Sequence, residues 1–163
     1  WPPQASGAQA LAPVALAPLN DSQAWQMPTP ADNPSGKRAV TTAERVEFDV
    51  PSEGWNEFMH SNPQKLVLQP ETTYRLQYDY TVLREASGGE GATFYQLVRT
   101  GAAPVREDVG WQNWTDPAGA TGRRVVTFTT RAFPSYYLIF GVRHSGAIRL
   151  ENIRLWRLPK SEG

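Results

Sequence analysis

Three tryptophans lie in polar, turn-rich segments of this chain rather than in apolar runs. Trp55 lies in GWNEFMHSNP, and Trp111 and Trp114 lie in EDVGWQNWTDPAGATG. A tryptophan in a protein core normally belongs to an apolar strand or helix, which removes its large surface from water. We therefore expect these rings to stand on loops at the rim of the fold, where at least one of Trp111 and Trp114 covers the open end of the core; Trp55 could serve either the core or a ligand. There each ring offers a flat surface for the C–H-rich face of a pyranose, so the chemistry predicted is sugar binding.

Two sets of polar and aromatic side chains could complete such a site. Arg75, Gln77 and Asp79 alternate along one strand-like run and form a polar row. Arginine donates, aspartate accepts and glutamine does both, which are the groups needed to bind vicinal hydroxyls. Tyr95 and Arg99 are predicted on the ligand side of a second run, because the other phase of that run is more apolar. The alternative for the polar row is a solvent-exposed strand face without a ligand.

Short strands must carry these residues, because no segment has sustained helical spacing. Residues 74–82 alternate over nine positions, with Tyr and Leu in one phase and Arg, Gln and Asp in the other, which is typical of a half-buried strand. In the C-terminal strand the apolar phase changes between Leu150 and Ile153, which predicts a β-bulge at Glu151 and Asn152. Further strands are predicted at residues 39–50, 92–101, 123–132, 136–146 and 147–159. Many short strands separated by turns predict an all-β, antiparallel β-sandwich.

The composition changes near residue 25, which divides the 163-residue chain. Residues 1–24 are rich in Ala and Pro and almost uncharged, so we interpret them as a linker or as an edge segment of the sandwich. The edge alternative depends on Val14, Leu16 and Leu19. Residues 25–159 form the predicted sandwich, and residues 160–163 form a tail.

Charge and residue usage exclude several classes of function. The chain has 16 basic and 16 acidic residues, whereas a nucleic-acid binder needs a positive face, so no nucleic-acid partner is expected. No apolar run reaches the roughly 18–20 residues that span a bilayer, so no membrane partner is expected either. The chain has no cysteine, and its two histidines are far apart, so neither a disulfide framework nor a histidine metal site is predicted.

Three segments resemble the jelly-roll carbohydrate-binding modules of families 4, 9, 16 and 22, which are attached to glycoside hydrolases. TYRLQYDYTVL is similar to their central strand, and YYLIFGVRHSGAIRLENIRLW is similar to their closing pair of strands. The stretch from residue 46 to residue 63, which ends WNEFMHSNP, resembles the preceding strand and loop.

The resemblance implies a jelly-roll fold and a secreted or extracytoplasmic, non-catalytic module. Its ligand would be a polysaccharide or oligosaccharide, held by Trp111, Trp114 and Trp55 together with a polar concave strand face. Its partner would be the catalytic domain of a multidomain enzyme. Such modules often bind a structural calcium through an aspartate near the end of the chain. Glu151 stands at that position here, so a calcium ligand is predicted at Glu151.

Three alternatives to sugar binding follow from the same residues. The sandwich could be an interaction module whose loops pack on a catalytic domain, which the Ala/Pro-rich segment favours. A small glycoside hydrolase would need two carboxylates about 5–10 Å apart, and Glu57 and Asp108 are the pair nearest to the tryptophans. A polysaccharide lyase would need a Tyr/His/Arg set such as His60, Tyr95 and Arg99. Since nothing in their spacing singles out a catalytic group, we predict that the protein is not an enzyme.

Overall fold

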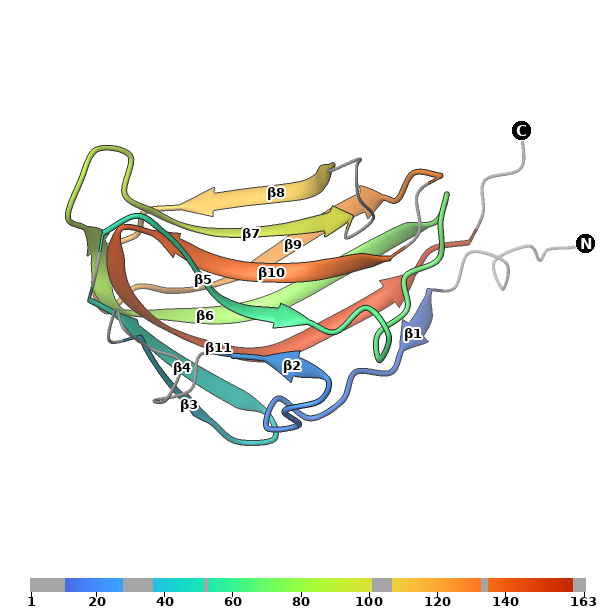
Figure 1. Ribbon diagram of the computed structural model, residues 1–163, viewed down its shortest axis with the longest axis horizontal. Coiled ribbons are helices and arrows are strands. Elements are labelled where there is room, and N and C mark those ends of the chain that lie inside the picture. Colours follow the sequence, from blue (N-terminus) through green and yellow to red (C-terminus); the bar gives the residue numbers. More distant parts are fainter. Residues whose placement is uncertain (1–10, 28–36, 52, 101–106, 133–134, 160–163) are drawn as a thin grey trace, which may run out of the picture.

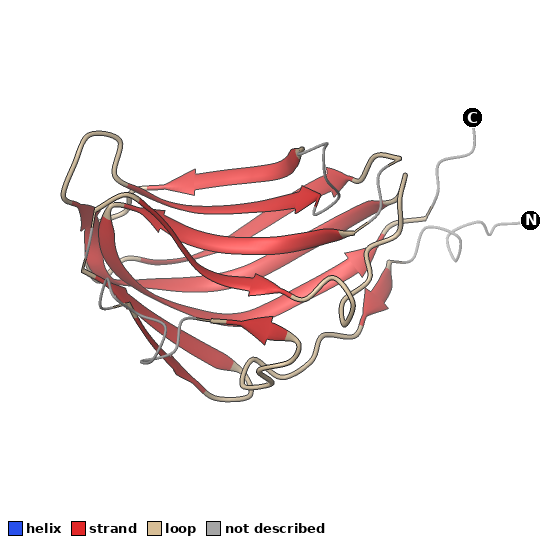
Figure 2. Ribbon diagram, viewed as in Figure 1, coloured by secondary structure: helices blue, strands red, loops and turns tan. Residues whose placement is uncertain are grey.

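The computed structural model describes residues 11–27, 37–51, 53–100, 107–132 and 135–159. Residues 1–10 of the predicted N-terminal segment and the predicted tail, 160–163, lie outside the described residues. Strands and loops make up the whole of the described chain (Figure 2). This part of the chain contains no helix of the length and apolar character that crossing a membrane requires.

The strands form two antiparallel sheets that face each other as the layers of a sandwich (Figure 1). The first sheet has the order β3-β4-β11-β6-β9, with β1 also paired to β11, and the second has the order β2-β5-β10-β7-β8. The strands of the first sheet are β1 (Ala12–Val14), β3 (Arg38–Thr41), β4 (Arg45–Val50), β6 (Thr73–Ser87), β9 (Thr121–Thr129) and β11 (Ser145–Arg157). Those of the second are β2 (Trp25–Gln26), β5 (Trp55–Ser61), β7 (Thr93–Thr100), β8 (Asp108–Trp114) and β10 (Tyr136–Arg143). The predicted all-β sandwich is confirmed.

The core lies between the sheets and follows from alternation along the strands. In β6, Tyr74, Leu76 and Tyr78 are buried, whereas the intervening side chains are only partly buried, as the sequence pattern predicts. Phe48 of β4 stacks on Phe58 of β5 at a ring-centroid distance of 4.0 Å, which joins the first sheet to the second. The two layers therefore share one aromatic core.

Two details of the first sheet bear on the predictions from sequence. Residues 39–50 form two paired strands, β3 and β4, rather than one, because the amide of Thr42 donates to the carbonyl of Arg45 and closes a turn. The predicted bulge is confirmed: the register of β11 against β6 shifts between Glu151 and Arg154. Asn152 has a φ of 53°, a left-handed conformation that asparagine tolerates better than most residues.

The N-terminal segment belongs to the sandwich wherever the structure describes it. Strand β1 pairs with the last three residues of β11, and Leu19 is buried in the core. The indole N–H of Trp25 donates to the carbonyl of Ala17 at 3.0 Å. Residues 12–14 therefore form an edge strand of the first sheet, and Leu19 adds to the core.

Trp114 belongs to this core, as expected for at least one of Trp111 and Trp114, so its prediction as a loop residue that offers a ligand surface is wrong. It is the last residue of β8, only 4% of its surface is exposed, and its ring packs against Tyr78, Tyr80 and Phe94. The guanidinium of Arg124 lies 5.2 Å from the ring centroid and covers it from the edge of the sandwich. Burial of this ring stabilises the contact between the sheets.

Replacing Trp114 tests this assignment. We expect Trp114→Ala to lower the free energy of unfolding by about 3–5 kcal/mol, because it leaves a large cavity in a close-packed core. Trp114→Phe should lose less stability, since it retains an aromatic ring in the core. It also removes an indole N–H that has no hydrogen-bond partner among the described residues. Urea unfolding measures both changes, with Trp111→Ala as the exposed control. Equal stability of the two alanine variants would contradict the assignment.

Candidate ligand-binding cleft

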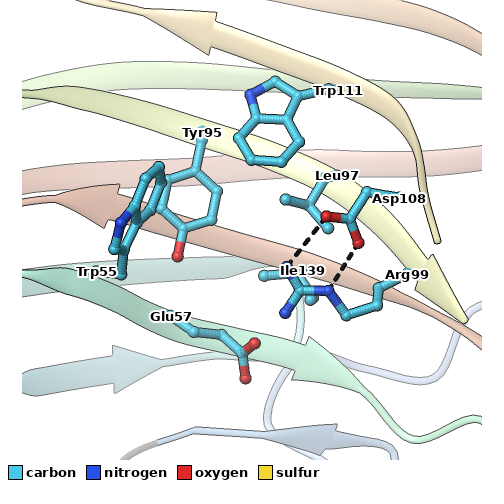
Figure 3. Close-up of a pocket in the computed structure, with 8 residues that line it drawn as sticks. All are labelled: Trp55, Glu57, Tyr95, Leu97, Arg99, Asp108, Trp111 and Ile139. Atoms are coloured by element: carbon cyan, nitrogen blue, oxygen red, sulfur yellow. Dashed lines mark hydrogen bonds and ion pairs between the residues drawn. The ribbon is translucent and has the colours of Figure 1, made fainter. Parts of the chain in front are cut away.

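A cleft of about 390 Å³ lies on the outer face of the second sheet. Its side chains come from four neighbouring strands, β5, β10, β7 and β8, and reach the surface because they occupy the phase that faces away from the core. Aromatic rings gather at one end of the cleft, and an arginine–aspartate pair lies at the other (Figure 3). The lining residues are Trp55, Glu57, Tyr95, Leu97, Arg99, Asp108, Trp111 and Ile139.

A bulge in β8 brings Trp111 and Asp108 to the same side of the sheet. Residues three apart on a regular strand face opposite sides. The register of β8 shifts between Gln96 and Val98 of β7, so Gly110 and Trp111 together lie opposite one residue of β7. Gly110 has a φ of 62°, the left-handed conformation that glycine supplies in such bulges. The tryptophan is thus on a strand, not on the predicted loop.

A second bulge, in β5, does the same for Glu57 and His60. The register between β5 and β10 shifts near the middle of the pair. Phe58 and Met59, although adjacent, are both buried in the core. As a result Glu57 and His60 both face the cleft side, and Nδ1 of His60 lies 2.7 Å from the carboxylate of Glu57. Trp55 lies at the start of this strand rather than on a loop.

Trp55, Tyr95 and Trp111 form one continuous aromatic group. The ring centroids of Tyr95 and Trp111 are 6.1 Å apart at 27°, and those of Trp55 and Trp111 are 6.4 Å apart at 88°. Tyr95 is buried, whereas 59% of Trp55 and 41% of Trp111 are exposed. The tyrosine is therefore a support, and the two indole rings are the surfaces that a ligand can contact.

Hydrogen-bonding groups surround this aromatic group. Arg99 donates to both oxygens of Asp108, at 2.7 and 3.2 Å, and this pairing raises the pKa of Arg99. Burial raises the pKa of Tyr95, the charge of Glu57 raises it further, and the charge of Arg99 opposes both. The Tyr95 hydroxyl therefore keeps its proton, and can donate a hydrogen bond, across the neutral and mildly alkaline range.

The predicted polar row does not belong to this cleft. Arg75, Gln77 and Asp79 lie on β6, on the outer face of the first sheet, so the expectation that they lie near the tryptophans is wrong. Asp79 accepts hydrogen bonds from Arg123 at 2.7 Å and from Asn152 at 2.8 Å, and these bonds lower its pKa. Its carboxylate is thus already engaged by the protein. Alternation along β6 correctly predicted that Arg75, Gln77 and Asp79 share one face of their strand. The sheet to which β6 belongs depends on its pairing with strands far away in the chain.

Glu151, the predicted calcium ligand, has an arginine as its partner. Its carboxylate accepts two hydrogen bonds from Arg45, at 3.2 and 3.0 Å. Calcium is normally bound by six to eight oxygens, yet in the described parts of the chain no three His, Cys, Asp or Glu side chains gather where they could hold a metal ion. The carboxylate of Glu151 is therefore already engaged by Arg45, and calcium stays a prediction from sequence alone.

Four of the predicted ligand residues, Trp55, Tyr95, Arg99 and Trp111, lie together in the cleft. From the sequence, Glu57 and Asp108 were expected only as a candidate hydrolytic pair, and nothing predicted Leu97 and Ile139 at the site. Leu97 shares the phase of Tyr95 and Arg99, so alternation along β7 could have identified it. Ile139 had no such signal, because the strand around it is apolar in both phases.

Several solved structures have a fold similar to that of this chain. No protein-family model matches the chain, and no curated protein matches it in sequence. The CBM22-1 xylan-binding domain of Paenibacillus barcinonensis Xyn10C has a similar structure, with a TM-score of 0.65 at 9% identity over 94% of this chain and 99% of that domain. The Clostridium thermocellum endo-1,4-beta-D-xylanase 10B, solved as CBM22-1-GH10 modules with xylohexaose, gives 0.63 at 8% identity.

The match to the xylanase covers 93% of this chain but only 30% of that one. The N-terminal cellulose-binding domain of Cellulomonas fimi beta-1,4-glucanase C is also similar, with a TM-score of 0.52 at 17% identity over 77% of this chain and 84% of that domain. At such low identity the likeness shows the fold alone. The chain has the jelly-roll fold of carbohydrate-binding modules, as its sequence predicts.

Gly141 of β10 offers a test of the aromatic arrangement. A Cβ atom at this position would lie 2.3 Å from Cζ and from the hydroxyl of Tyr95, so only glycine lets that ring lie across the strand. We expect Gly141→Ala to displace the ring, to change the near-ultraviolet circular dichroism of the aromatic group and to destabilise the fold by about 1–3 kcal/mol.

The control is the same substitution in a Tyr95→Ala background. There the added methyl group should cost less, since its main obstacle is gone, and the two substitutions should be non-additive by about 0.5–3 kcal/mol. Strict additivity in thermal unfolding would show that Gly141 does not act through Tyr95.

Proposed function

We propose that this protein is a non-catalytic carbohydrate-binding module that binds a β-1,4-linked polysaccharide or oligosaccharide in the cleft of the second sheet. The observation that carries the proposal is the pair of exposed indole rings, Trp55 and Trp111, supported by Tyr95 in one cleft. Stacking of a planar ligand on an aromatic side chain contributes about 1–3 kcal/mol per ring, by analogy with nucleic-acid bases. Two rings and a few hydrogen bonds are consistent with affinities in the micromolar to millimolar range.

The similar structures support this class of ligand. Two of them are a xylan-binding domain and a xylanase bound to xylohexaose, and a third is a cellulose-binding domain from a beta-1,4-glucanase. A β-1,4-linked chain of pyranoses is a flat ribbon with C–H groups on its faces and hydroxyls along its edges. Such a ribbon matches a cleft that has aromatic rings at one end and hydrogen-bonding groups around them.

The polar groups of the cleft suit the edges of this ribbon. Glu57 and Asp108 can accept hydrogen bonds from sugar hydroxyls, and Tyr95 can donate one. Arg99 uses its guanidinium to hold Asp108 in place, so the carboxylate is oriented before a ligand arrives. A site that is ordered in advance loses less entropy on binding.

The partner that we propose is the catalytic domain of a multidomain carbohydrate-active enzyme that works outside the cytoplasm. The support is the xylanase structure, in which a module of this fold and a GH10 module belong to one protein. In such an enzyme the module would hold the catalytic domain close to its polymer.

Removing the exposed rings tests the binding proposal. We expect Trp111→Ala and Trp55→Ala each to weaken binding of xylohexaose, or of whichever oligosaccharide of a β-1,4-linked panel binds best, by about tenfold or more. Isothermal titration calorimetry or affinity electrophoresis measures the change.

The matched controls lie on the other sheet. Gln77→Ala and Asp79→Ala alter the polar row that faces away from the cleft, so we expect them to leave affinity within about twofold, because surface substitutions away from the site have small effects. No retention on any polysaccharide of a broad panel would reject the binding proposal and favour the interaction alternative.

Catalysis can be tested directly, because Glu57 and Asp108 line the same cleft. A glycosidase requires a carboxyl group that donates a proton to the leaving oxygen. Here Asp108 accepts two hydrogen bonds from Arg99, and Glu57 is paired with His60. We therefore expect no release of reducing ends from xylan or cellulose oligosaccharides. Release that disappears in Glu57→Gln or Asp108→Asn would make this protein a hydrolase.

A further inference from the structure

Arg143 lies beside the aromatic end of the cleft. It follows the buried Val142 in β10, so its side chain emerges on the outer face of the second sheet, between Trp55 of β5 and Thr93 of β7. Its guanidinium carbon lies 5.0 Å from the centroid of the Trp55 ring. The cation is thus next to one of the two rings on which a sugar would stack.

The hydrogen-bond donors of Arg143 are not used by the described part of the protein. A guanidinium has five N–H donors in a planar fork. Among the residues that the structure describes, this side chain makes no hydrogen bond or ion pair, and its guanidinium lies over the Trp55 ring. The charged groups that line the cleft have partners: Arg99 pairs with Asp108, and the carboxylate of Glu57 lies against the imidazole of His60. Arg143 is therefore a cation of this face that has no acidic partner among the described residues.

The position of this guanidinium is nevertheless fixed. Its strand pairs on both sides, with β5 and with β7. A Cβ atom on Gly91, in the connection between β6 and β7, would lie 2.6 Å from Nη1 of Arg143, so the guanidinium approaches the Gly91 backbone closely. Held between Gly91 and Trp55, the half-buried fork loses little freedom when it binds an anion.

We infer that the cleft binds a glycan that carries carboxylate groups, such as uronic acid substituents, and that Arg143 pairs with one of them. This inference rests on the proposed function and specifies its substrate class. The planar fork of arginine matches a carboxylate with two parallel hydrogen bonds. A sugar stacked on Trp55 would bring its substituent to this fork, whereas a neutral glycan would leave the fork without an acceptor.

The test compares two forms of one polymer. Glucuronoxylan and the same polymer with its carboxyl groups reduced to alcohols are titrated against the protein by calorimetry. At low ionic strength we expect the acidic form to bind about fivefold more tightly, which corresponds to an exposed ion pair. The preference should disappear in about 1 M NaCl, where the Debye length is about 3 Å.

Variants of Arg143 separate a carboxylate contact from a purely structural role. Arg143→Gln should bind the acidic polymer no better than the reduced one, and Arg143→Lys, which retains the charge but not the fork, should show an intermediate preference. Arg123→Gln removes an arginine from the outer face of the first sheet and should retain the full preference. Thermal unfolding verifies that each variant is folded.

Each of the following three outcomes contradicts the inference. Equal binding of both polymers by the unmodified protein rejects it and leaves the proposed function intact. Equal weakening of both polymers by Arg143→Gln shows that Arg143 only supports the Trp55 ring. Failure to bind either polymer, or any neutral oligosaccharide, rejects the inference together with the proposed function.

Discussion

The ligand face of this protein depends on two β-bulges that flank the central strands of the second sheet. β5 and β8 lie on either side of the pair formed by β10 and β7, and each contains an extra residue. Without these bulges His60 would face opposite to Glu57, and Asp108 opposite to Trp111. Either Glu57 or His60 would then point into the apolar core, where an unpaired charge is costly, and Asp108 and Trp111 could not both line the cleft. The bulges instead place both members of each pair on the surface.

Strands β7 and β10, which lie between the two bulged strands, form the base of the cleft. In β7, Phe94 and Val98 face the main core, whereas Tyr95 and Leu97 face outward and pack with Ile139 of β10 into a small second cluster. This cluster is almost fully buried, although it lies on the outside of the sandwich. It supports the exposed indole rings from below, and Gly141 provides the space that the Tyr95 ring needs.

The two outer faces of the sandwich differ in the side chains that they leave available to a ligand. On the first sheet, acidic groups pair with arginines of adjacent strands, as in Asp79 with Arg123 and Glu151 with Arg45, so these carboxylates are engaged by the protein. Exposed pairs of this kind add little stability, but they leave the paired carboxylates less available to a ligand. On the second sheet, aromatic rings and one guanidinium without an acidic partner among the described residues remain available. This difference explains why the cleft, rather than the polar row of β6, is the candidate site.

Local patterns in the sequence determined the fold class, the buried phase of β6 and the bulge at Glu151 and Asn152. Each of these depends on neighbouring residues and on the two-residue period of a strand, which can be observed in one chain. The sequence also selected Trp55 and Trp111 as exposed rings. It could not determine which of Trp111 and Trp114 faces the core, because alternation gives their opposite phases but the facing of β8 is set by its pairing with β7.

Only the tertiary structure decided which residues share a face. Tyr95 and Asp79 both alternate out of the core, yet they lie on opposite sides of the sandwich, because β7 pairs with β10 and β6 pairs with β11. Such pairing joins segments far apart in the chain, and no local pattern encodes it. The sequence therefore specified the surfaces that each strand offers, and long-range strand order determined which of them combine into a site.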